Sequence, residues 1–153
     1  MILAVCAVFL TTFSGCKKDD DEVVDMMKRV TVTLSGAQEV PAVTSTGTAS
    51  AKLIFDPSLK TINYSITWTL GSAAATTTGM HFHGAEDGSD MKNSGVVPGF
   101  GLTGFSTTNT GTFSGTTTAL TDAQVAQLLA GKWYLNIHSS TVTSGELRGN
   151  IKF

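Results

Sequence analysis

A strict alternation of apolar and polar residues from position 61 to position 70 constrains the fold of this 153-residue chain more than any other feature. The apolar members are Ile62, Tyr64, Ile66, Trp68 and Leu70. Successive side chains of a β-strand point to opposite faces, so the pattern predicts one strand with a buried face and a wet face. Such a strand is typical of an antiparallel sheet that is covered on one side.

Similar strand signals recur between turn-forming segments. Clear alternation occupies residues 30–35, 48–55, 133–138 and 147–153, and shorter or weaker stretches occupy residues 80–83, 96–105 and 110–119. Pro98 interrupts one of the weaker stretches and predicts an edge strand or a bulge there. Seven to eight short strands separated by turn signals favour an all-β antiparallel sandwich.

One short helix is predicted among these strands. Thr121 and Gln124 have the spacing of a capping box, in which each side chain bonds the backbone N–H of the other residue. Gly131 stands where a helix usually ends. The predicted apolar stripe consists of Val125, Leu128 and Leu129. The helix is expected to be structural.

Residues 1–16 form an apolar run with the pattern of a secretory signal peptide, too short for a membrane-spanning helix. The run ends in Phe13-Ser14-Gly15-Cys16, which resembles the bacterial lipobox, whose cysteine becomes the lipidated first residue. Phe13 stands where Leu is usual, and no Lys or Arg precedes the run. We expect a lipid anchor on Cys16; a plain signal peptide and a buried N-terminal strand are the alternatives.

The charged residues 17–27 are expected to form a flexible acidic tether. The acidic run also resembles the surface-export signals of Bacteroidetes lipoproteins, although Lys17 and Lys18 precede it. Residues 28–153 then form the folded domain. This organisation predicts an extracytoplasmic protein anchored to a bacterial membrane, with the outer membrane expected and the domain facing the periplasm or the cell surface.

Charge and motif content argue against several classes of function. The chain has 10 basic and 12 acidic residues, a formal net charge of −2, which favours neither nucleic acid nor an acidic lipid surface as a partner. The glycines of residues 99–105 match a nucleotide-binding loop only loosely, and no βαβ unit surrounds them, so no nucleotide site is expected. A G-x-S-x-G nucleophile elbow is absent from the sequence.

Three segments, in this order, resemble the CHRD domain, the module named after chordin. They are LSGAQEVPAV at 34–43, MHFHGAEDG at 80–88 and WYLNIHSSTVTSGELRGNI at 133–151. A second proline that is frequent after VP is missing, and SSTVTSGE replaces a common Asn-Pro-Gly loop. The resemblance implies an immunoglobulin-like β-sandwich outside the cytoplasm, and we expect this domain to bind a protein or another envelope component. It implies no catalytic residue, so a binding role is expected over an enzymatic one.

The three histidines of the chain are the main candidates for chemistry. His81 and His83 are two residues apart on one predicted strand, so their rings share a face about 6.6 Å apart at the backbone. His138 lies on the polar face of another predicted strand. Three imidazoles placed in this way can bind one zinc or copper ion. In this hypothesis Glu146, across the predicted hairpin from His138, accepts the second ring N–H of that histidine.

Three further interpretations of the histidines remain open, one of which is catalysis without a metal. Copper/zinc superoxide dismutase is also a β-sandwich with a His-x-His strand, which suggests a redox-active metal, but its other ligands have no counterparts at matching spacing here. In the structural alternative, the rings bond backbone groups at the sandwich rim or buried acids. That alternative pairs His81 with Glu86 or Asp87, and His138 with Glu146.

The acidic loop with Glu86, Asp87 and Asp90 follows the histidine strand. These carboxylates are calcium candidates, but they lack the spacing of an EF-hand, so a solvated loop is expected. This loop and residues 139–145 are expected to form the binding surface, since loops on rigid sandwiches usually carry recognition. Glu146 and Arg148 share a strand face and are expected to belong to a structural ion network.

Overall fold

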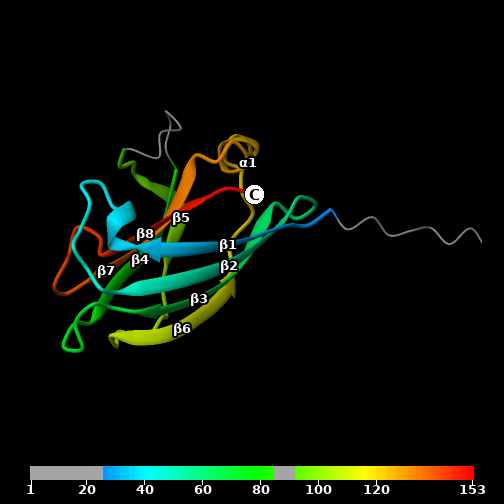
Figure 1. The fold of residues 1–153 in the computed structure, drawn as a ribbon. Coiled ribbons are helices and arrows are strands. Elements are labelled where there is room, and N and C mark those ends of the chain that lie inside the picture. Colours follow the sequence, from blue (N-terminus) through cyan, green and yellow to red (C-terminus); the bar gives the residue numbers. More distant parts are fainter. Residues whose placement is uncertain (1–25, 85–91) are drawn as a thin grey trace, which may run out of the picture.

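The computed structural model describes residues 26–84 and 92–153, and their fold is built on one antiparallel β-sheet. Its strands are β1 (Lys28–Ser35), β2 (Thr48–Asp56), β3 (Thr61–Thr69), β4 (Thr77–Gly84), β5 (Val96–Leu102), β6 (Thr110–Thr116), β7 (Trp133–Ser139) and β8 (Leu147–Ile151). The strand order across the sheet is β5-β4-β7-β8-β1-β2-β3-β6 (Figure 1). A single 3-10 turn, η1 (Gly36–Gln38), follows β1.

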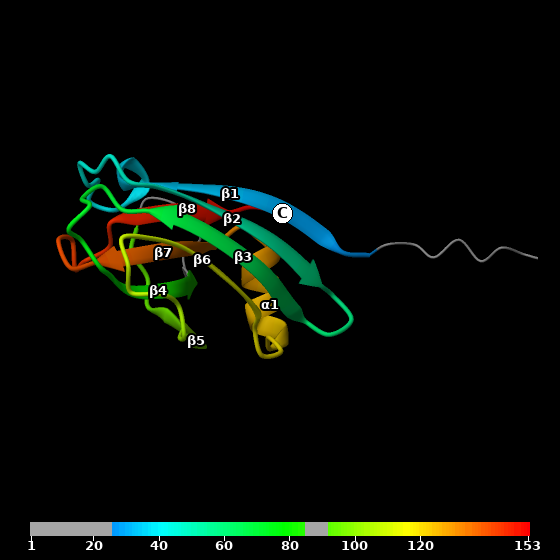
Figure 2. The same ribbon diagram turned by 90° about the horizontal axis from the view of Figure 1, so that it is seen from below.

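The eight strands form one sheet that curls until its two halves face each other. Figure 2 shows β1, β2 and β3 arching over β4 and β5. Tyr64 of β3 lies against Phe82 of β4 at 6.1 Å between ring centroids, although these strands are not paired. The indole N–H of Trp68 donates to the Thr77 hydroxyl over 2.8 Å across the same interior. The all-β antiparallel class is therefore confirmed, and the two expected layers are the halves of a continuous sheet.

The buried face of the sheet follows the alternation of the sequence. Ile62, Ile66 and Trp68 of β3 are at most 1% exposed, and β2 and β6 flank them in unbroken register. Each large apolar side chain buried in this way contributes roughly 1.5–3 kcal/mol. Only Tyr64 departs from full burial, because it packs near the open side of the curl between Phe82 and Phe113.

The two ends of the sheet differ in regularity. β6 pairs with β3 without interruption, whereas β5 pairs with β4 through a register shift between His81 and His83. β5 contains Pro98, which has no N–H to donate, and it lies at the edge of the sheet as predicted. The irregular pairing leaves the end of β4 that bears the histidines less tightly constrained by β5.

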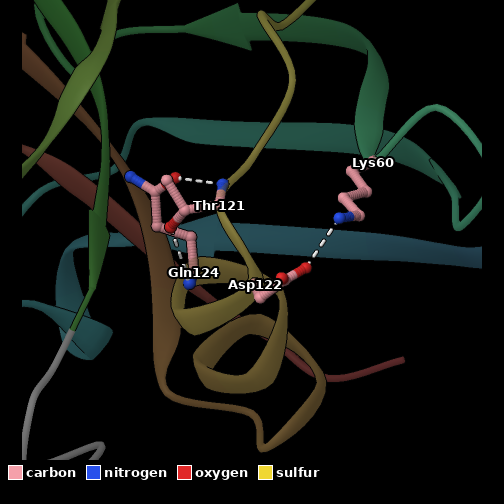
Figure 3. A network of polar contacts seen from close by, with 4 residues as sticks. All are labelled: Lys60, Thr121, Asp122 and Gln124. Carbon is pink, nitrogen blue, oxygen red and sulfur yellow. Dashed lines mark hydrogen bonds and ion pairs between the residues drawn. The ribbon is translucent and has the colours of Figure 1, made fainter.

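The helix α1 (Asp122–Leu129) begins with the predicted capping box. The Gln124 amide N–H donates to the Thr121 hydroxyl over 3.3 Å, and the Thr121 amide N–H donates to the Gln124 side chain over 2.8 Å (Figure 3). Lys60 adds a 2.6 Å ion pair to Asp122. The helix ends before Gly131, whose φ is +71°.

The apolar stripe of the helix is narrower than predicted. Leu128 is fully buried and Val125 is half-buried against the core, but Leu129 is 42% exposed. The helix has only eight residues, or about two turns, and Leu129 lies about 100° around the helix axis from Leu128.

The part of the chain that the structure describes contains no helix with the length and hydrophobicity of a membrane span.

Replacing Thr121 with Ala is expected to lower the free energy of unfolding by about 1 kcal/mol, because the Gln124 backbone N–H loses the hydroxyl that accepts from it. Urea denaturation followed by circular dichroism measures the change. Thr103→Ala, in an exposed loop, is the matched control and is expected to shift the stability by less than about 0.5 kcal/mol. Equal effects of the two substitutions would contradict the capping role.

Candidate functional site

Adjacent strands β4 and β7 bring the three histidines together. In their antiparallel register Gly79 lies opposite His138, and His81 lies opposite Asn136. Residues of the same parity on the two strands share a face, which here is the face turned away from the buried Phe82 and Leu135. The predicted clustering of His81, His83 and His138 therefore arises from ordinary strand pairing.

The three imidazoles converge closely. One ring nitrogen of each histidine lies within 4.8 Å of the corresponding nitrogens of the other two. The ring centroids of His81 and His138 are 4.9 Å apart, and those of His81 and His83 are 5.8 Å apart. This is the only group of three or more potential metal-binding side chains found in residues 26–84 and 92–153.

His138 is oriented by a backbone carbonyl. Its Nδ1 lies 2.8 Å from the carbonyl oxygen of Thr143, which can only accept, so Nδ1 carries the proton. In the neutral ring this leaves a lone pair on Nε2, and that atom is buried without a hydrogen-bond partner among the described residues. A ring held through one nitrogen with the other directed inward is the usual arrangement of a metal-binding histidine.

His83 is held in the same manner. Its Nδ1 lies 2.8 Å from the Ser94 carbonyl oxygen, and its Nε2 lies 3.0 Å from Oδ1 of Asn136. The ring also stacks on Tyr134, with centroids 4.6 Å apart and planes 2° from parallel. His83 is only 8% exposed. These contacts fix the orientation of the imidazole before any ligand binds.

His81 occupies a space that two glycines leave open. Its Nδ1 is buried without a partner in the part of the chain that the structure describes. A Cβ atom at Gly79 would lie 2.9 Å from Cε1 of His81, and one at Gly101 would lie 3.5 Å from its Cδ2. Any side chain at Gly79 would therefore push the His81 ring out of the cluster.

The surroundings keep two of the rings neutral. Burial lowers the pKa of His81, and the neighbouring His138 and His83 lower it further, against an opposing effect of the Asn136 side chain, which favours the protonated ring. Burial also lowers the pKa of His83, although the bonds to Ser94 and Asn136 oppose it. Neutral imidazole is the form that binds metal, so these shifts extend metal competence to lower pH.

Glu146 does not take the role that the sequence suggested. Its position is opposite His138 in the extended β7–β8 register, but its Oε1 accepts hydrogen bonds of 2.7 Å from the Ser45 hydroxyl and the Gly71 amide. Burial alone would raise the pKa of Glu146, but hydrogen bonds from Ser139, Gly71 and Ser45 outweigh it and lower the pKa. The carboxylate ties three loops together, and the Thr143 carbonyl holds His138 in its place.

Arg148 is fully buried on the same face of the sheet. Its guanidinium lies 3.6 Å from the ring centroid of Tyr134, and it donates to the Lys92 carbonyl over 3.1 Å and to Asn93 Oδ1 over 3.2 Å. Tyr134 thus contacts both His83 and Arg148. The arginine fastens the segment containing Ser94 over the histidine cluster, and these partners of its guanidinium differ from the Glu146 of the expected ion network.

Sequence reasoning did not single out Glu39, a buried acid close to this cluster. Glu39 is 7% exposed, and its Oε1 has no hydrogen-bond partner among the described residues. Burial raises its pKa from an ordinary 4.5 to about 7, although the charge of Arg148 opposes the shift. A Cβ atom at Gly145 would meet both Glu39 Oε1 at 2.6 Å and Asn136 Nδ2 at 3.0 Å, so both side chains line this glycine.

Several predicted site residues lie outside the described part of the chain. They are Cys16, Glu86, Asp87 and Asp90. The expectations of a lipid anchor, an acidic binding loop and a pairing of His81 with Glu86 or Asp87 therefore stay predictions.

Comparison with known proteins gives one match. The family model of the CHRD domain matches residues 30–151, which is most of the chain and includes all three histidines. No curated protein and no solved structure matches significantly.

Replacing Glu39 with Gln is expected to stabilise the protein above pH 7 by at most about 3 kcal/mol. Because the folded pKa of Glu39 is raised from 4.5 to about 7, wild-type stability declines as pH rises through this range, and the variant lacks that decline. Chemical denaturation from pH 4 to 9 measures the difference in free energy of unfolding between the two proteins. The histidines are present in both, so their contributions cancel in this difference.

Glu146→Gln is the control of opposite sign, because the pKa of Glu146 is lowered in the folded protein. The ionised carboxylate therefore stabilises the fold at neutral pH, and this stabilisation is lost as pH falls. It is expected to destabilise the protein at pH 8. Parallel pH profiles for wild type and Glu39→Gln would contradict the burial of an acid at this position.

Proposed function

Since the chain belongs to the CHRD family, we propose that it is a binding module and that its ligand is a zinc or copper ion held by His81, His83 and His138. The observation that carries the proposal is the convergence of three ring nitrogens within 4.8 Å, two of which, on His81 and His138, are buried and unpaired. A buried polar atom without a partner costs roughly 1–3 kcal/mol, and a bound cation removes that cost at both histidines.

The chemistry of the donors supports these metals. Imidazole suits zinc, copper, iron and nickel, whereas magnesium and calcium prefer oxygen ligands. Zinc–nitrogen bonds are about 2.0–2.1 Å long, so the ring nitrogens move slightly inward from their present positions on binding. His81 is free to do so by a small rotation, since its ring lies beside Gly79 and Gly101 and its Nδ1 has no hydrogen-bond partner among the described residues.

We further propose that the module works outside the cytoplasm on a lipid anchor at Cys16. The support is the apolar run ending in the lipobox-like residues 13–16 and the charged segment that follows it. In this arrangement the folded domain presents its metal site at the bacterial envelope. A protein or another envelope component stays a candidate ligand for the loop after β4. Residues 85–91 of this loop lie outside the described part of the chain.

Titration of the full chain with Zn²⁺ or Cu²⁺ at pH 7.5 is expected to show one tight site per molecule. Cys6→Ser and Cys16→Ser are included so that thiolates do not contribute. His81→Ala and His138→Ala are each expected to weaken binding by more than about 100-fold. At free metal 100-fold above Kd, the bound protein gains about 2.7 kcal/mol of stability, measured as a rise in Tm.

Asp122→Asn is the control for this titration, because that carboxylate is exposed and pairs with Lys60 away from the cluster. It is expected to leave the affinity unchanged. An absence of 1:1 binding, or equal binding by the histidine variants, would overturn the metal proposal.

The lipid anchor has its own test in bacterial cells that express the full chain and are fed a tagged fatty acid. Wild type and Cys6→Ser are expected to carry the tag and to sediment with membranes. Cys16→Ser is expected to lose both properties. A tagged Cys16→Ser protein, or an untagged wild type, contradicts the anchor.

A further inference from the structure

The histidine cluster contains a fourth electron-pair donor. We infer that the side-chain oxygen of Asn136 is the fourth ligand of the metal, so that the site is closed by four protein atoms and holds its ion without an open position. This inference rests on the proposed metal function and specifies the site further.

Asn136 lies at the centre of the cluster. It belongs to β7, faces His81 across the β4–β7 pairing and Arg148 across the β7–β8 pairing, and is 4% exposed. Its Oδ1 lies 3.0 Å from Nε2 of His83, and Asn136 is the direct cross-strand neighbour of His81. Asn136 therefore contacts the ring of His83 and lies beside His81, on the strand that carries His138.

The arrangement of lone pairs around this point suits a cation. The Ser94 carbonyl accepts from Nδ1 of His83, so a neutral His83 ring presents a lone pair at Nε2. In the protonated ring, Nε2–H donates to Oδ1 of Asn136 at 3.0 Å, whereas in the neutral ring the Nε2 lone pair faces this second acceptor. His138 presents a lone pair at Nε2 by the same reasoning from the Thr143 carbonyl. Acceptors that face one another without a proton repel, and a metal ion between them turns the repulsion into coordination.

The amide has a reason to keep its oxygen on the histidine side. Its Nδ2 points toward Gly145, where the unpaired Oε1 of buried Glu39 also lies. The oxygens of the ionised Glu39 carboxylate can only accept, so rotation of the Asn136 amide by 180° would turn the amide oxygen toward another acceptor. Ionised Glu39 thus favours the present orientation of the amide.

The separation of the donors agrees with four-coordination. Neighbouring ligands of a tetrahedral ion with bonds of 2.0–2.1 Å are about 3.3 Å apart. The 3.0 Å between His83 Nε2 and Asn136 Oδ1 is already close to that value. Sites closed by four protein ligands hold zinc structurally, whereas catalytic zinc sites keep one position for water or substrate. The closed set therefore favours retention of the ion over catalysis that needs an open coordination position.

Cobalt substitution tests the fourth ligand, because tetrahedral Co²⁺ absorbs visible light far more strongly than five- or six-coordinate Co²⁺. The full chain with Cys6→Ser and Cys16→Ser is loaded with one equivalent of Co²⁺. We expect a tetrahedral spectrum, and no inner-sphere water in the relaxation of water protons. Asn136→Leu, similar in shape but without a lone pair, is expected to bind about 10–100-fold more weakly and to admit water. Asn136→Asp retains an oxygen and is expected to keep the tetrahedral spectrum.

The outcomes separate the two proposals. An inner-sphere water on Co²⁺ in the protein with Asn136 intact overturns the fourth ligand while one-to-one binding upholds the metal function, and this result needs no Asn136 variant to fold. An unchanged spectrum and affinity in Asn136→Leu has the same meaning. Failure of the parent protein to bind any of Co²⁺, Zn²⁺ and Cu²⁺ overturns both.

Discussion

The pairing of β4 with β7 is the constraint on which the rest of this structure depends. Its register sets Phe82 beside Leu135 in the core and, on the opposite face, His81 beside Asn136. A shift of this pairing by one residue would turn the apolar side chains outward and the imidazoles into the core, so the hydrophobic effect itself fixes the polar cluster in place. The geometry of the candidate site is therefore a by-product of core packing on the other side of the same two strands.

Both faces of this part of the sheet are covered, which explains the electrostatics. The segment around Ser94 lies over the outer face and is fastened by Tyr134 and Arg148. Water is thereby excluded from His83, and the neutral form of the ring is favoured. Backbone carbonyls also orient the imidazole rings of His83 and His138. Each carbonyl accepts a hydrogen bond from Nδ1, so the lone pair of the neutral ring is on Nε2.

Local patterns in the sequence predicted much of the fold. The period-2 alternation placed the strands, Thr121 and Gln124 marked the start of the helix, and Pro98 marked an edge strand. The same parity rule also predicted that His81 and His83 share a face. The width of the apolar stripe on the helix was overestimated. The exposure of Leu129 depends on how the helix lies against the sheet, which the sequence of the helix does not determine.

The partners of the histidines were beyond local reasoning. Glu146 was assigned to His138 from the hairpin register alone. Its carboxylate instead accepts hydrogen bonds from Ser45 and Gly71, which are distant in sequence. Ser94 and Thr143 contribute carbonyl oxygens, and backbone groups carry no sequence signal. Glu39 gave no pattern of its own, since its burial arises only when the loop after β1 packs near the β7–β8 hairpin.

The place of β1 in the sheet has a mechanical consequence. The chain enters the domain at Lys28, and β1 lies between β8 and β2 in the interior of the sheet, paired with β2 along its whole length. A pull on the polypeptide from its N-terminal side acts along the axis of β1, so it loads the β1–β2 hydrogen bonds in parallel and does not peel them one at a time. A pull across the strand axis would instead break these bonds one at a time, under a far smaller force.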